Sequence, residues 1–169
     1  MKAKLSLIVQ PVAALLLACN AGLVSASDHY QMAIVEATPG ASAIQQGDAA
    51  KGLSTLHSSK ADGDVFARTM ALCVANTQLA DISVASSACT RAITLARSQA
   101  QASAAERREM QALALSNRGV MHWVAQDLAK AQQDFQRAAK LSDSELVQHN
   151  LQQFSYRLQG LNQKLALAQ

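Results

Sequence analysis

The stretch that decides the fold is Asn117-Arg-Gly-Val-Met-His-Trp-Val-Ala-Gln-Asp-Leu-Ala-Lys-Ala131, which continues as Gln-Gln-Asp-Phe-Gln-Arg-Ala138. It carries small residues at Gly119, Ala131 and Ala138 and a large apolar residue at Phe135. Two antiparallel helices in close contact need this arrangement, because small side chains let the backbones approach while a large one fills the next hole. The stretch therefore predicts a helical hairpin.

The same pattern of residue positions recurs twice toward the N-terminus. Forty-six residues upstream, the equivalent positions hold Cys73, Asp81, Ala85, Cys89 and Ala92. Thirty-three residues before that, Asp48 precedes Gly52 and Leu56 in the corresponding places. A period near 34 residues, built of helix-turn-helix units, is typical of an array in which each unit stacks on the next.

Composition also favours an all-α protein. Half of the 169 residues are hydrophobic and only 4% are aromatic, and both prolines, Pro11 and Pro39, lie in the first quarter of the chain. Nothing after Pro39 is therefore forced to break a helix. The net charge is +3, and it falls to +1 without Lys2 and Lys4 (15 − 2 = 13 basic residues against 12 acidic ones). Such a balance gives little attraction for nucleic acid, so we expect no nucleic-acid partner.

Residues 1–26 resemble an export signal. Lys2 and Lys4 precede an apolar run, and Val24-Ser-Ala26 is a small-residue cleavage site. An alternative stays open, because Leu16-Leu-Ala-Cys19 resembles a bacterial lipobox, in which Cys19 would be lipidated and would bring the protein to a membrane. In either case we expect the chain to leave the cytoplasm, with the periplasm as its destination.

The mature chain divides into five parts. A flexible lead-in, loose or extended, is expected at 27–37. It is followed by a partial repeat at 38–58, full repeats at about 64–98 and 104–141, and a C-terminal capping helix at 142–169. Thr38-Pro39 is expected to start the first helix. Ser103 with Glu106, and Ser142 with Glu145, have the spacing of capping boxes. Asp64 is expected to cap the helix that begins at Val65.

An apolar stripe marks the last helix. It consists of Val147, Leu151, Phe154, Leu158, Leu161 and Leu165, spaced alternately by four and three residues. Such a stripe predicts a helix that caps the final repeat, because every stacked array must cover its last exposed face. The alternative is a seam for a partner or for a second copy of the chain.

Cys73 and Cys89 are expected to form a disulfide. They lie about equally far from the predicted turn at Ala80, so antiparallel helices bring them opposite one another, and an exported chain meets an oxidising compartment. Two buried free thiols are the alternative. A catalytic redox pair is disfavoured because no CxxC spacing is present to lower a thiol pKa.

With a Cys in each helix of one hairpin and the run Ala114-Leu-Ser-Asn-Arg-Gly119, the chain resembles exported bacterial tetratricopeptide repeat (TPR) proteins of uncharacterised role. The resemblance covers residues 43–141. It implies an all-α, short TPR-like superhelix of antiparallel helix pairs. It also implies a concave groove for a partner, lined by Met70, Val74, Thr77, Gln78, Ser116, Val120, Trp123 and Val124. Val74 and Val120 stand where the family's carboxylate-clamp members require Asn, so recognition of a C-terminal carboxylate is not expected.

No constellation of catalytic or metal-binding residues is apparent. The four histidines are scattered without ligand spacing, so neither metal nor cofactor is expected. Trp123 could anchor a peptide in the groove or pack in the core. We therefore expect a non-enzymatic scaffold that binds a peptide or protein partner through the groove. The alternative is an assembly subunit that contacts partners or itself through the stripe at 147–165.

Overall fold

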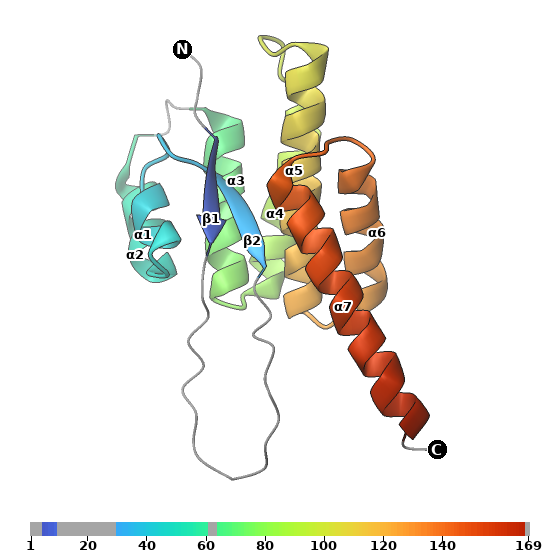
Figure 1. Cartoon of the computed structure of the whole chain (residues 1–169). Helices are drawn as coiled ribbons and strands as arrows, with labels where there is room; N and C mark the ends of the chain where they lie inside the picture. The colour runs from blue at the N-terminus through green and yellow to red at the C-terminus, as the bar shows by residue number, and fades with distance from the viewer. Residues whose placement is uncertain (1–4, 10–29, 61–63, 168–169) are drawn as a thin grey trace.

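The computed structural model of the chain describes residues 30–60 and 64–167 in full and the backbone of residues 5–9 (Figure 1). The described part is mostly helical, which confirms the all-α class. The helices are α1 (Ala41–Gln45), α2 (Ala49–Ser58), α3 (Val65–Gln78), α4 (Ile82–Arg97), α5 (Ala104–Val124), α6 (Leu128–Ala139) and α7 (Glu145–Leu167). Two short strands, β1 (Leu5–Val9) and β2 (Gln31–Val35), form an antiparallel pair.

The helices follow one another as antiparallel hairpins, α1 with α2, α3 with α4 and α5 with α6, while α7 packs on α5 and α6 (Figure 1). β2 contacts the first helix of the last two hairpins, α3 and α5, and also α7. The last turns of α7 extend away from the other helices. The strand is therefore packed directly onto one side of the helical array.

The three hairpins turn in the same way. In each hairpin an aspartate caps the second helix, and the residue just before that aspartate has a positive φ. These residues are Gly47, Ala80 and Gln126, with φ values of 85°, 56° and 61°. The aspartate that follows donates its N–H to the carbonyl five residues earlier, at 2.9 Å in all three turns. Its carboxylate then caps the new helix by accepting an N–H from the residue three positions on. The repeat seen in the sequence is thus a repeat of backbone conformation.

Because Ala80 adopts a left-handed conformation that only glycine adopts without strain, we expect Ala80→Gly to stabilise the protein by about 0.5–1 kcal/mol. The matched control is Ser87→Gly, in the right-handed interior of α4, which should lower stability by about 0.5 kcal/mol. Urea unfolding of the two variants measures both effects. Equal losses in the two variants would contradict the argument.

One close crossing holds each of the last two hairpins together. In the last, a Cβ added at Gly119 would lie 2.7 Å from the Phe135 ring, so only glycine fits there. In the middle hairpin, Cys73 and Cys89 occupy the equivalent positions, and their Cα atoms are 4.7 Å apart. The same helix contact is filled by a packed ring in one unit and by a covalent bond in the other.

The described part of the predicted lead-in, residues 30–37, contains a strand. Residues 31–35 form β2, and the side chains of Met32, Ala33, Ile34 and Val35 are buried. Met32 and Ile34 lie in one apolar cluster and Ala33 and Val35 in the other, as the alternation of a strand requires. The segment is extended, as one of the two interpretations had it, and it is packed between helices that bury both of its faces.

Two predicted helix starts are also corrected. The N-cap of α1 is Gly40, in a left-handed conformation, and Thr38 instead forms a turn with Val35 and Ala41. Gly40 is required there because a Cβ would lie 2.2 Å from the carbonyl oxygen of Gly52. Ser142 is not the N-cap of α7, since the helix begins only at Glu145; its hydroxyl donates to Glu109 and accepts the N–H of Ser144 in the turn before the helix. The capping box of Ser103 and Glu106 forms as predicted.

Candidate functional site

Two buried asparagines hold β2 by its backbone. The N–H of Ala33 donates to Oδ1 of Asn117 at 2.8 Å, and Nδ2 of Asn117 donates to the Ala33 carbonyl at 2.8 Å. Asn150 repeats the arrangement on Gln31, with distances of 2.8 and 2.7 Å, and also donates to Oγ of Ser116 at 2.9 Å. Both amides are fully buried. Because their bonds to β2 reach only main-chain atoms, the two asparagines recognise an extended backbone rather than particular side chains.

The other edge of β2 faces β1. In an extended chain successive residues direct their N–H and C=O groups to opposite sides, so Met32 and Ile34 direct theirs away from the two asparagines. In the antiparallel register Ile8 lies opposite Met32, and Ser6 opposite Ile34. These are therefore the hydrogen-bonded pairs of the ribbon. One edge of β2 is held by side chains and the other by a second strand.

Five of the eight predicted groove residues lie in the two apolar clusters that contain this strand. Val74, Val120 and Trp123 are buried in the cluster that contains Met32 and Ile34, and Val124 packs against it. Met70 is buried in the cluster of Ala33 and Val35. Thr77 and Ser116 are also buried, and Gln78 is partly buried. The five apolar residues of the predicted groove therefore pack with the chain's own strand, whereas Gln78 donates to the Ile44 carbonyl of α1.

Trp123 belongs to an aromatic cluster and is not an exposed anchor. Its indole ring lies 5.3 Å from the ring of Phe154 and 6.2 Å from those of Tyr30 and Phe135, and only 4% of the residue is exposed. The nearly perpendicular contacts with Phe135 and Phe154 are of the favourable edge-to-face type. Of the two roles that the sequence left open for Trp123, the structure shows core packing.

Sequence reasoning missed the two asparagines. A signal was present: Asn117 and Asn150 are 33 residues apart, close to one repeat, and each lies inside an otherwise apolar helix face. Asparagine is a poor helix former, and burying its amide is costly unless the amide is hydrogen-bonded. Two such residues at one repeat position indicate a shared hydrogen-bonding task.

The predicted disulfide between Cys73 and Cys89 is confirmed. Both residues are fully buried between α3 and α4, so the bond is structural. Cys19, Val24 and the cleavage site at Ala26 lie outside the described residues.

The apolar stripe of α7 is buried only in its first half. Val147 and Phe154 are buried, Leu151, Leu158 and Leu161 are partly buried, and 65% of Leu165 is exposed. The first half caps the final hairpin, since Phe154 contacts the rings of Trp123 and Phe135. The second half leaves apolar side chains in solvent.

A partly buried ion pair links the helices on another side of α5. Arg118 donates through Nε and Nη2 to the two carboxylate oxygens of Asp134 on α6, at 2.7 and 2.9 Å, and through Nη1 to Thr90 on α4, at 3.2 Å. Nε2 of His122 lies 3.8 Å from the same carboxylate. Burial lowers the pKa of His122, and the charge of Asp134 opposes that shift only in part.

Within residues 5–9, 30–60 and 64–167, no group of three or more His, Cys, Asp or Glu side chains could hold a metal ion. In the same ranges, none of the helices combines the length and the apolar character needed to cross a membrane.

The comparisons with known proteins found no relative of the chain. No family model, curated protein or solved structure matches the chain.

Proposed function

We propose that the protein is a non-enzymatic interaction module, a short TPR-like array that is exported to the periplasm and binds a partner protein there. The array is supported by three hairpins with the same turn and by the equivalent crossings at Gly119 and Cys73. Export is supported by the signal-like residues 1–26 and agrees with the disulfide.

The mode of binding that we propose is strand addition to β2. The observation that supports this mode most directly is that Asn117 and Asn150 hold one edge of β2 rigidly while its other edge pairs with β1. β1 lies within the segment that we expect to be removed. A chain that begins at Ser27 lacks β1, so Met32 and Ile34 would present their N–H and C=O groups to an incoming strand.

Such an edge selects a partner by conformation. An extended segment gains main-chain hydrogen bonds with Met32 and Ile34, and alternate side chains give specificity. The sequence of β1, Leu-Ser-Leu-Ile-Val, is rich in apolar residues and free of proline. We propose that the partner segment is extended, apolar and proline-free in the same way.

The test uses the chain's own strand as a probe. A fluorescent peptide with the sequence of residues 4–10 is titrated into protein that begins at Ser27, and binding is followed by anisotropy. N-methylation at the peptide positions of Ser6 and Ile8 removes N–H groups that face β2, whereas N-methylation at those of Leu7 and Val9 leaves them intact. We expect saturable binding that the first pair abolishes and the second preserves.

Two further measurements test the same mode of binding. Hydrogen exchange at the amides of Met32 and Ile34 should slow when the peptide binds. The unprocessed chain, in which the free edge of β2 pairs with β1, should bind the peptide more weakly. Absence of binding, or equal loss with both methylation patterns, would falsify strand addition.

The exposed end of α7 favours a second candidate, self-assembly through the stripe, because 65% of Leu165 and 89% of Leu167 are exposed. A chain that ends at Gln159 keeps Asn150 and Phe154 but lacks these leucines. If the stripe drives assembly, light scattering should show an oligomer for the full chain and a monomer for the shortened one. If peptide binding alone matters, the shortened chain should bind the peptide unchanged.

A further inference from the structure

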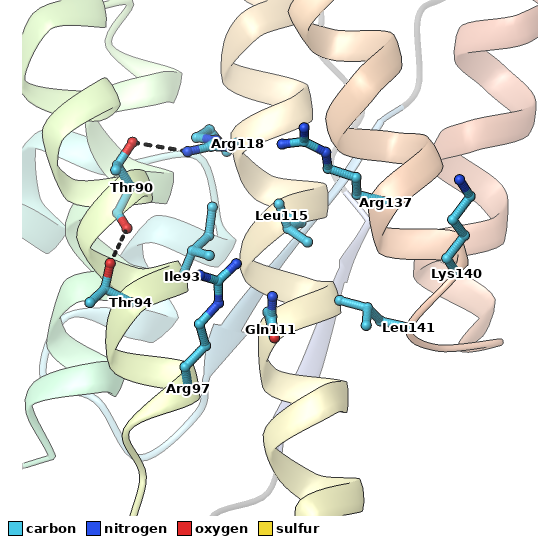
Figure 2. Close-up of a pocket in the computed structure, with 10 residues that line it drawn as sticks. All are labelled: Thr90, Ile93, Thr94, Arg97, Gln111, Leu115, Arg118, Arg137, Lys140 and Leu141. Atoms are coloured by element: carbon cyan, nitrogen blue, oxygen red, sulfur yellow. Dashed lines mark hydrogen bonds between the residues drawn. The ribbon is translucent and has the colours of Figure 1, made fainter.

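A second concave site lies between α4, α5 and α6, away from the strand. The pocket has a volume of about 440 Å³. It is lined by Thr90, Ile93, Thr94 and Arg97 of α4, by Gln111, Leu115 and Arg118 of α5, and by Arg137, Lys140 and Leu141 of α6 and its end (Figure 2). Its volume is within the range of small-molecule sites, about 300–1,000 Å³. Neither strand addition to β2 nor assembly through α7 uses this pocket.

The charge of the pocket is strongly one-sided. Four of its ten lining residues are cationic, namely Arg97, Arg118, Arg137 and Lys140, and none is acidic. The ion pair with Asp134 neutralises Arg118, which leaves a net charge of +3 (4 − 1). The whole chain carries only +3, so this one pocket holds an excess as large as that of the entire protein.

The cations differ in how firmly they are held. Arg118 is fixed by Asp134 and Thr90, and the side-chain oxygen of Gln111, in the amide orientation that satisfies its neighbours, accepts from Nη2 and Nε of Arg97 at 3.0 and 3.1 Å. Arg137 and Lys140 are exposed, and their side chains have no hydrogen bond or ion pair within the described ranges. The site thus combines two positioned guanidinium groups with two cations that are free to bind an anion.

The pocket also has an apolar part. Ile93 and Leu115 are 5% and 4% exposed, and Leu141, which is partly buried, lies beside Lys140. In Figure 2 the side chains of Leu115 and Ile93 lie between the guanidinium groups of Arg97 and Arg118. A ligand that fits both features carries negative charge at one end and an apolar body at the other.

We propose that this pocket binds a small organic anion, namely a phosphate monoester or a carboxylic acid with an apolar part, through Arg137, Lys140 and Arg97 around an Ile93–Leu115 floor. The site is independent of the strand edge, since β2 packs on α3, α5 and α7. If the pocket does not bind such an anion, the proposal that β2 binds a peptide still stands, and the reverse also holds.

The test uses phenyl phosphate as the probe, with inorganic phosphate and phenol as its charged and apolar halves. Calorimetry and methyl NMR are performed on the chain that begins at Ser27. The double variant Arg137→Gln/Lys140→Gln removes the two unpaired cations, and Lys51→Gln/Lys164→Gln, on α2 and α7, removes the same charge elsewhere. All four residues are exposed, so both variants should melt as the unaltered protein does.

We expect phenyl phosphate to bind more tightly than either half and to shift the methyl signals of Ile93, Leu115 and Leu141. The Arg137/Lys140 variant should bind at least about tenfold more weakly, while the Lys51/Lys164 variant keeps its affinity. Absence of binding, equal losses in the two variants, or equal affinities for phenyl phosphate and inorganic phosphate would each overturn the proposal. Equal losses of affinity in the two variants would indicate general electrostatic attraction to a basic surface.

Discussion

Replacing Gly119 with leucine is expected to destabilise the protein by about 3 kcal/mol or more. A Cβ alone would approach two atoms of the Phe135 ring to 2.7 and 2.8 Å, and Phe135 is fully buried against Trp123 and Phe154. The ring cannot move aside without disturbing the aromatic cluster. Thermal unfolding followed by circular dichroism measures the loss, which should lower Tm by roughly 10 °C.

Gly160 provides the matched control. It lies in α7, where an added Cβ would meet nothing within 4 Å, so Gly160→Leu should be neutral or slightly stabilising through helix propensity. A second comparison isolates the contact: Phe135→Ala should recover part of the loss in the Gly119→Leu background, because the two residues touch. Additive losses in the double variant would show that the clash is not the cause.

Removing the disulfide is expected to lower the free energy of unfolding by about 3 kcal/mol. Cys73 and Cys89 close a loop with a sequence separation of 16, and the bond constrains the unfolded chain. The variant Cys73→Ala/Cys89→Ala should also lose packing, since both sulfurs are fully buried. Urea unfolding with and without a reducing agent measures the effect.

The double variant serves as its own control, because reductant should leave its stability unchanged. Thiol titration in denaturant should find no free thiol in protein that begins at Ser27 and was purified under oxidising conditions. Two titratable thiols would contradict the bond.

Helices could be predicted from the sequence because their signals are local. Asp64 accepts from the N–H groups of Phe66 and Ala67, and Ser103 forms its box with Glu106, so each of these helix starts is encoded by residues close together in the chain. The hairpin crossings are likewise encoded by residue size at fixed spacing, as Gly119 and Phe135 show. Such patterns can be read without knowing the rest of the fold.

The strand could not be predicted in the same way. β2 has only five residues. Asn117 lies 84 residues along the chain from Ala33, the strand residue that it holds, and Asn150 lies 119 residues from Gln31. No local period marks a segment whose conformation is imposed by distant helices. The same reason made the groove around Val120 and Trp123 look open, because its contents come from a remote part of the chain.

The basic pocket was also beyond sequence reasoning. Arg97, Arg118 and Arg137 come from three different helices, and the chain as a whole is nearly neutral in charge. Only the packing of α5 against both α4 and α6 brings them to one place.

The hold of Asn150 on Gln31 has a consequence for folding. Stacked repeats ordinarily touch only their neighbours, so they can begin to fold anywhere and fray from their ends. Here the strand that precedes the first helix, α1, docks on the last helix, α7, across 119 residues. Closing so long a loop is slow, and β2 can dock fully only after α7 has left the ribosome. In return, both ends of the array are tied together, and we expect a single cooperative transition in place of stepwise unravelling.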